Sequence, residues 1–338
     1  RALSGRRHGN EASSGRDPDL HPSRRLSLLI RTAFERIARF ATWLMAGALV
    51  VGYVAQPIAE LFRPFILHAM VILLAIAMVR LDFEKLRGYI RRPRVLTAIV
   101  IVNLVAAPLM MWLMIQPLNI PKSLEQGLFL MAAAPMISSA IAISTILELD
   151  AALAVAAMVT TYAIVPFTLP TLSVWLIGLD LGVSIWEMFV RLFLTIAAPA
   201  ALALVLRRWV FRRETLVYNA RAIDGLGVVF VVIFCLGIMD GIATFAEGRF
   251  EYVILTLMAA FAANIAMQVF GTVLFLRLGR REALTIGLVT GNTNLGLVMV
   301  VLADKASPDL IAYFVLGQVP MYFLPVVALP IYRRLVAA

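Results

Sequence analysis

The sequence predicts an all-α polytopic membrane protein of ten transmembrane helices, arranged as two inverted five-helix repeats. Composition is the first reason, because 62% of the 338 residues are hydrophobic and only 15% are charged. Length is the second, because the chain holds a series of apolar runs of about 20 residues, which is what one membrane crossing requires. The third is that two of these runs, one in each half of the chain, are interrupted by polar segments.

The chain opens with a segment that is rich in Arg, Ser, Gly and Pro. Because apolar residues are few there, we assign residues 1–36 to a disordered basic cytoplasmic tail. The end of this tail, from about Leu28, is expected to rest as a basic helix on anionic lipid. Residues 37–335 then form one ten-helix membrane domain.

The five spans of the first half are apolar runs between charged turns, and they cover residues 37–56, 60–79, 95–115, 124–148 and 151–176. The spans of the second half follow the same rule and cover residues 184–206, 225–245, 252–276, 282–303 and 309–332. An even number of spans places both termini on the same side of the membrane.

The basic residues support this count. Of the 30 Lys and Arg residues, 25 fall in the segment up to residue 40, in the loops 80–94, 207–221 and 277–281, and at the C-terminus, all on one side. Only Arg63, Lys122, Arg249 and Lys305 fall on the other side. By the positive-inside rule, both termini are cytoplasmic. We therefore expect an integral protein of a bacterial inner (plasma) membrane. The same loop pattern accounts for the net charge of +10 and excludes nucleic acid as a partner.

Polar residues recur between the two halves. Asp82 and Asp240 follow the second and seventh spans, and Glu125 and Glu282 open the fourth and ninth. Because five spans is an odd number, the second half enters the membrane from the opposite side. The sequence therefore predicts an inverted repeat.

The fourth span is broken around 135–139 and the ninth around 290–294. Unpaired backbone groups are costly in hydrocarbon, so these breaks must be buried in protein or line a wet cavity. Paired broken helices indicate the binding site of a secondary transporter. Freed helix N-termini favour an anion. The candidate residues for a small organic anion or metabolite are Ser138, Ser139, Thr290, Asn292, Thr293 and Asn294, with Asn103 and Asn264 from neighbouring spans.

These segments resemble the bile acid:sodium symporter family of the bile/arsenite/riboflavin transporter superfamily. The likeness covers about residues 40–335. It includes Arg80-Leu81-Asp82-Phe83 through Asn103 and Pro108, Ala134 to Ser139, and Thr290 to Asn294. The resemblance implies a panel domain of helices 1, 2, 6 and 7 and a core domain of helices 3–5 and 8–10. It also implies transport by alternating access.

The chain departs from the family where the family holds sodium. The resemblance places the sodium ligands at Ala140, Ile141, Ala154, Met158 and Val289, which are all apolar here. Asn103 and Thr293 stand at positions of the second sodium site. By contrast, Ser138 and Asn294 match positions that contact the organic anion in bacterial relatives. We therefore expect a carrier without the usual two-sodium coupling.

Two charged or ionisable groups inside spans remain. His68 in the second span is either a proton-coupling group or a neutral, hydrogen-bonded side chain. Arg191 and Glu187, one turn apart in the sixth span, are expected to form a surface ion pair. The single Cys235 excludes a disulfide within the chain and a Cys-rich metal site, and we expect no cofactor.

Two alternatives stay open beside the carrier without sodium. One is a sodium-dependent organic anion symporter with altered sites. The other is a membrane sensor or scaffold that kept the fold and lost transport. An enzyme is not expected, because no nucleophile with a nearby base and no paired carboxylates stand at membrane depth.

Overall fold

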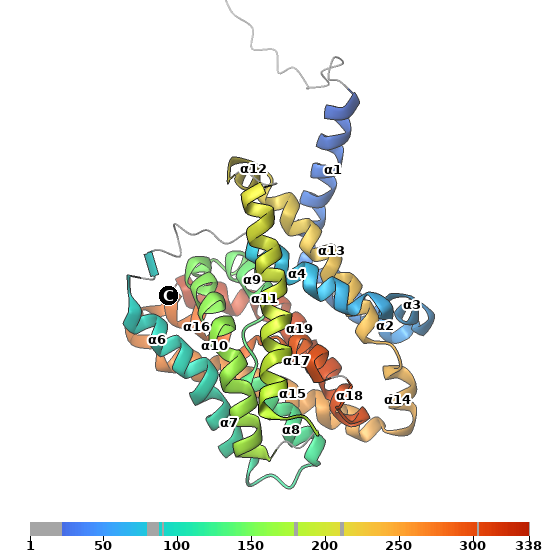
Figure 1. Cartoon of the computed structure of the whole chain (residues 1–338), viewed down its shortest axis with the longest axis vertical. Coiled ribbons are helices and arrows are strands. Elements are labelled where there is room, and N and C mark those ends of the chain that lie inside the picture. Colours follow the sequence, from blue (N-terminus) through green and yellow to red (C-terminus); the bar gives the residue numbers. More distant parts are fainter. Residues whose placement is uncertain are drawn as a thin grey trace, which may run out of the picture.

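The computed structural model describes residues 22–79, 88–89, 91–178, 182–209, 213–302 and 304–337. The described part is built of helices (Figure 1), and its one β-type contact is an isolated antiparallel bridge between Met136 and Thr293. The tail residues 1–21 and the loop that holds Asp82 lie outside the described residues.

The helices of the first half are α1 (Pro22–Arg39), α2 (Ala41–Val54), α3 (Gln56–Phe62), η1 (Arg63–Phe65), α4 (Ile66–Val79), α6 (Pro93–Ile101), η2 (Val102–Ala106), α7 (Ala107–Ile115), α8 (Lys122–Ala133), α9 (Ser139–Ile146) and α10 (Ala151–Ile177). The helices of the second half are α11 (Ile185–Trp209), α12 (Arg213–Tyr218), α13 (Ala220–Ile238), α14 (Ile242–Gly248), α15 (Phe250–Leu274), η3 (Leu276–Leu278), α16 (Arg280–Gly291), α17 (Leu295–Leu302), α18 (Pro308–Leu316) and α19 (Val319–Ala337).

Six helical segments in the described part are long and apolar enough to cross a membrane, namely Gln56–Val79, Pro93–Ile115, Ala151–Ile177, Ile185–Trp209, Ala220–Gly248 and Phe250–Leu274. Two bent pairs raise the number to as many as eight if each counts as one span, namely Leu29–Arg39 with Trp43–Val54 and Pro308–Pro325 with Val327–Val336. An integral membrane protein of helical type is therefore confirmed. The count of ten spans and the inverted repeat stay predictions.

The two interrupted spans fold as pairs of short helices. Helices α8 and α16 have 12 residues each, and α9 and α17 have 8 each. At a rise of about 1.5 Å per residue, none of the four is long enough to cross a bilayer alone. The breaks predicted at 135–139 and 290–294 are thus confirmed, at 134–138 and at 292–294.

Contacts between the helices define two groups. Helix α13 packs against α1, α2, α3 and α4, and α11 packs against α4; we call these six helices the panel group. Helices α6–α10 and α15–α19 pack mainly among themselves and form what we call the core group. In Figure 1 the helices α2–α4 and α13 gather to the right, while α6, α7 and α10 lie to the left.

The helix α1 corrects the prediction of a tail disordered through residue 36, because its residues 22–36 are helical. It extends from the top of the body in Figure 1 and packs on α13. A methyl group added at Gly225 of α13 would lie 1.9 Å from the backbone oxygen of Phe34. The basic helix expected from about Leu28 is present and begins earlier, at Pro22. The sequence did not show its packing on α13, because a tertiary contact leaves no trace in local composition.

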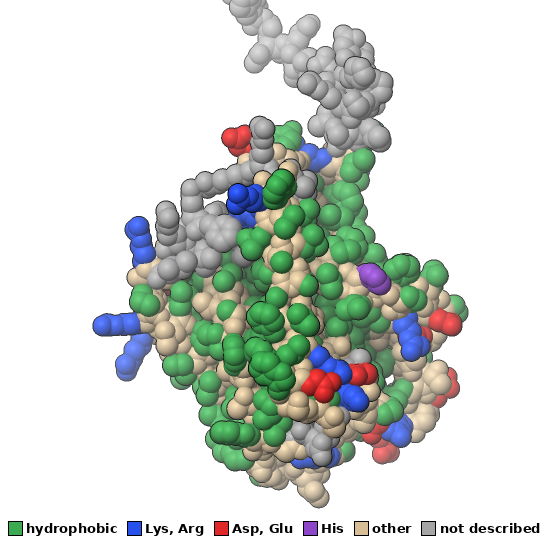
Figure 2. All heavy atoms as spheres, in the orientation of Figure 1, with side chains coloured by type: hydrophobic (Ala, Val, Ile, Leu, Met, Phe, Trp, Pro, Cys, Tyr) green, Lys and Arg blue, Asp and Glu red, His purple; other side chains and the backbone are tan. Residues whose placement is uncertain are grey.

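Charged side chains gather near the ends of the helices. Figure 2 shows a face covered mostly by hydrophobic side chains, as expected for a surface in contact with lipid. Along α11, Arg207 and Arg208 lie at one end and Glu187 and Arg191 near the other. We call the first the basic end and the second the far end of the molecule. The charge bias predicts that the basic end is cytoplasmic.

Candidate functional site

The two breaks meet and hydrogen-bond to each other. The amide of Ile137 donates to the oxygen of Asn292 at 2.8 Å, and the amide of Asn294 donates to the oxygen of Pro135 at 2.6 Å. These are the backbone groups that helix interruption frees, and each break satisfies the other away from lipid. The meeting point of the breaks, which we call the crossing, joins segments more than 150 residues apart.

Side chains of the second break fasten the crossing to the rest of the core group. The Thr293 hydroxyl donates to the oxygen of Met131 in α8 at 2.7 Å. The Asn294 Nδ2 donates to the Tyr162 hydroxyl of α10 at 2.7 Å, while its Oδ1 accepts the amide of Leu297 at 3.0 Å. The bond from the Leu297 amide to Asn294 caps the N-terminus of α17. Asn294 therefore starts a helix and anchors it to α10 at once.

A second hydrogen-bonded chain holds α15 against α16. Asn264 is fully buried; its Nδ2 donates to the oxygen of Gly291 at 2.7 Å, and its Oδ1 accepts a bond from Gln268 at 2.5 Å. The Tyr332 hydroxyl of α19 donates to Gln268 Oε1 at 2.6 Å. An added methyl at Gly291 would lie 2.3 Å from the Gln268 side chain, so the helices are in close contact. Asn264 acts here as a link between helices.

Three more of the predicted site residues bond to their own helices. Thr290, Asn292 and Asn103 are buried, and each donates to a backbone oxygen four residues earlier. Such bonds are common for polar side chains inside helices. Asn292 differs in one respect, since its buried Oδ1 has no hydrogen-bond partner in the described part of the chain.

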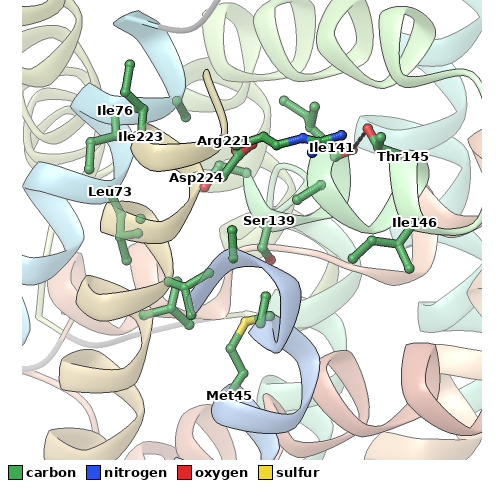
Figure 3. A pocket seen from close by; sticks show the side chains of 18 of the residues that line it. Met45, Leu73, Ile76, Ser139, Ile141, Thr145, Ile146, Arg221, Ile223 and Asp224 are labelled. Carbon is green, nitrogen blue, oxygen red and sulfur yellow. Dashed lines mark hydrogen bonds between the residues drawn. The ribbon is translucent and has the colours of Figure 1, made fainter. Parts of the chain in front are cut away.

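A cavity of about 520 Å³ separates the two helix groups on the basic side of the crossing. Residues of α1, α2, α4 and α13 line one wall, and residues of α9 and α10 line the other. Much of its wall is apolar, including Met45, Leu73 and Ile141, which Figure 3 shows around the space. The cavity is therefore bounded by both groups and not enclosed in one of them.

The first break lies at the deep wall of this cavity. Ser138 and Ser139 both line it, and Figure 3 shows Ser139 facing the space. The Ser139 Oγ is buried and has no partner within the described residues. The first-turn amides of Ala140 and Ile141 in α9 are engaged, because they donate to the backbone oxygens of Ile137 at 3.1 Å and Ser138 at 3.2 Å. The two serine hydroxyls are therefore the polar groups that the first break brings to this wall.

Four charged residues line the cavity toward the basic end: Glu35, Arg39, Arg221 and Asp224. Arg31 neutralises Glu35, because its Nε donates to the carboxylate at 2.8 Å and its guanidinium lies 3.9 Å from the centroid of the Tyr218 ring. Figure 3 shows Arg221 extending from α13 across the space toward Ile141 and Thr145 of α9. A positive group thus faces a solute on its way to the serines.

The sequence reasoning located the crossing and missed the charged entrance. Of the eight predicted site residues, Ser138 and Ser139 line the cavity. Thr293, Asn294 and Asn264 join different helices, and Thr290, Asn292 and Asn103 bond to the backbone of their own helices. His68 lies exposed on α4, where its ring meets the oxygen of Pro64 at 3.3 Å, and it does not line this cavity. Arg39 and Arg221 stand among the basic residues at the ends of predicted spans, so the sequence around them does not indicate that they line a cavity.

The positions where the resemblance places sodium ligands are apolar and well packed. Ala140, Ala154 and Met158 are fully buried, and Val289 is 1% exposed. Ile141 lines the cavity with a hydrocarbon side chain. Groups of three or more His, Cys, Asp or Glu residues that could hold a metal are not found among the described residues.

A model of the sodium bile acid symporter family matches residues 66–243, which is more than half of the chain. The matched region runs from the start of α4 through α13 and includes the first break, the serines and Arg221. No curated protein matches the chain.

Proposed function

The chain belongs to the sodium bile acid symporter family, and on that premise we propose that it is a carrier that moves a small organic anion or metabolite by alternating access. The observation that carries this proposal is the cavity, which lies between two helix groups and reaches the crossing at Ser138 and Ser139. A cavity walled by two groups changes its access when the groups move against each other, which is what alternating access requires.

The chemistry of the cavity favours an anion with an apolar body. Its volume of about 520 Å³ lies within the roughly 300–1,000 Å³ of small-molecule sites. Apolar side chains cover hydrocarbon, while the hydroxyls of Ser138 and Ser139 offer hydrogen bonds to an anionic group. Arg221 adds a positive charge along the path.

We propose further that transport does not use the family's two sodium ions. Sodium in such carriers is held by several oxygen atoms, often backbone carbonyls at helix breaks. Here the Met131 carbonyl is already engaged by Thr293, and Val289 stands where the resemblance implies a carboxylate. The Met131 oxygen at the crossing thus already accepts a hydrogen bond from the Thr293 hydroxyl. Without a carboxylate, a cation there would have no counter-charge.

Ligand-induced thermal stabilisation tests the site, with a panel of organic anions added in sodium or in choline buffer. A ligand that binds the folded state raises its unfolding temperature. Ser139→Ala is expected to reduce the shift, while Ser144→Ala, in the same helix but bonded to the Ala140 oxygen and away from the cavity, leaves it unchanged. Equal shifts in both variants would remove Ser139 from the site.

Solute flux in proteoliposomes then decides between the alternatives. The proposal expects saturable anion flux that is the same in sodium and in choline. A steep sodium dependence would favour the sodium-coupled symporter with altered sites. Binding without flux for every anion that stabilises the protein would favour the sensor or scaffold.

A further inference from the structure

We propose that Arg191 and Asp304 form a latch that closes the far end of the carrier, an inference that rests on the proposed transport by alternating access. Arg191 belongs to α11 of the panel group, and Asp304 follows α17 of the core group. The latch therefore joins the two groups on the side of the crossing opposite to the cavity.

The geometry of the latch is that of a two-pronged ion pair. The two terminal nitrogens of Arg191 reach the two carboxylate oxygens of Asp304 at 2.6 and 3.1 Å. The same guanidinium also donates to the oxygen of Val301 at 3.2 Å, in the last turn of α17. This forked arrangement fixes both distance and orientation, which a single contact would not. The surface pair expected with Glu187 exists too, at 2.8 Å.

Other contacts along α17, from the crossing outward, show that this helix is seated on the panel group. Helix α17 packs against α11 and α4. A methyl group added at Gly296 of α17 would lie 2.7 Å from the ring of Phe234 in α13. The next residue, Cys235, lies beside Tyr322 of α19 and is fully buried. The two groups are thus in direct contact here, whereas the cavity separates them at the basic end.

Opening the far end requires the latch to break. The bonds of the crossing tie α17 to α8 and α10, so α17 moves away from α11 when the core group moves. Arg191 must then release both Asp304 and the Val301 oxygen. Glu187 lies on the same helix as Arg191, so the arginine keeps a carboxylate partner after release. A retained partner lowers the cost of breaking the pair, as a reversible gate needs.

The single Cys235 is a natural reporter of this opening. It is fully buried, lies outside the cavity lining and stands beside the contact of α13 with α17. The test is the rate at which a polar maleimide labels Cys235 in protein reconstituted in lipid nanodiscs, where both faces are accessible. Since exposed pairs contribute up to about 1 kcal/mol, Arg191→Gln and Asp304→Asn should each raise the rate about three- to fivefold. The double variant should match Arg191→Gln, because that substitution already removes the pair with Asp304 together with the bond to the Val301 oxygen.

Arg63→Gln is the matched control. Arg63 pairs with Asp240 at 3.1 Å, also at the far end, but both residues belong to the panel side of the contact. Its labelling rate should equal that of the wild type. Unchanged rates in both latch variants, an equal rise in Arg63→Gln, or a double variant that multiplies the single effects would each overturn the latch. Faster labelling of the latch variants, in a protein that shows no solute flux, would support the latch and contradict the proposed transport function. Solute flux with unchanged labelling rates would support the transport function and contradict the latch.

Discussion

Replacing Asn294 by alanine is expected to destabilise the crossing through two losses. The buried Tyr162 hydroxyl loses the Nδ2 donor at 2.7 Å, and the amide of Leu297 loses the Oδ1 acceptor at 3.0 Å. An unsatisfied buried polar group costs about 1–3 kcal/mol, and loss of a helix cap costs about 1 kcal/mol. Together these losses lower the free energy of unfolding by about 2–4 kcal/mol.

A double-mutant cycle with Tyr162→Phe isolates the first loss. The phenylalanine removes the hydroxyl that Asn294→Ala leaves unpaired, so the double variant should be less destabilised than the sum of the single variants. The expected coupling is about 1–2 kcal/mol, which is typical of residues in direct contact.

The assay is thermal unfolding of the purified protein in detergent at one scan rate, because membrane proteins often unfold irreversibly. At roughly 2–4 °C per kcal/mol, Asn294→Ala should lower the midpoint by about 4–16 °C. A midpoint equal to that of the wild type, or strictly additive effects of the two substitutions, would show that the bond between α10 and α17 does not hold the crossing together.

Three further results are expected. Gly225→Ala places a methyl group 1.9 Å from a backbone oxygen of α1, so trypsin should cleave within α1 several-fold faster than in the wild type. Gly127→Ala places a methyl group 2.2 Å from the buried Tyr313 ring and should cost about 1–3 kcal/mol in thermal unfolding, whereas Gly47→Ala, with no atom within 4 Å, should not. The hydrogen bond from the latch arginine lowers the pKa of Asp304, and the latch needs the ionised carboxylate. Its contribution is therefore complete above the usual aspartate pKa and is lost as the pH falls through the lowered pKa. Labelling of the reporter cysteine, corrected for the reactivity of a free thiol, should stay flat near neutral pH and rise only in acid.

The polar residues near the crossing show where sequence reasoning reaches its limit. Asn264 and Thr290 stand in apolar runs near the second break, which is where a substrate ligand would stand too. In the structure Asn264 holds the oxygen of Gly291, and Thr290 bonds within its own helix. A buried polar side chain forms a hydrogen bond with whichever group lies in reach, a bound solute or a backbone oxygen. Only the packing of the neighbouring helix decides which of the two it meets.

The sequence alone determined that this chain is a helical membrane protein with two interrupted apolar runs, one in each half of the chain. Hydropathy and the cost of unpaired backbone in lipid act within a window of about 20 residues, so the printed order of residues is enough to show them. Tertiary structure alone decided that the breaks bond to each other, that Arg221 faces the cavity and that Arg191 reaches Asp304. Each of these contacts joins residues about 75 or more positions apart. The free energy that brings them together comes from the packing of whole helices, which no local pattern records.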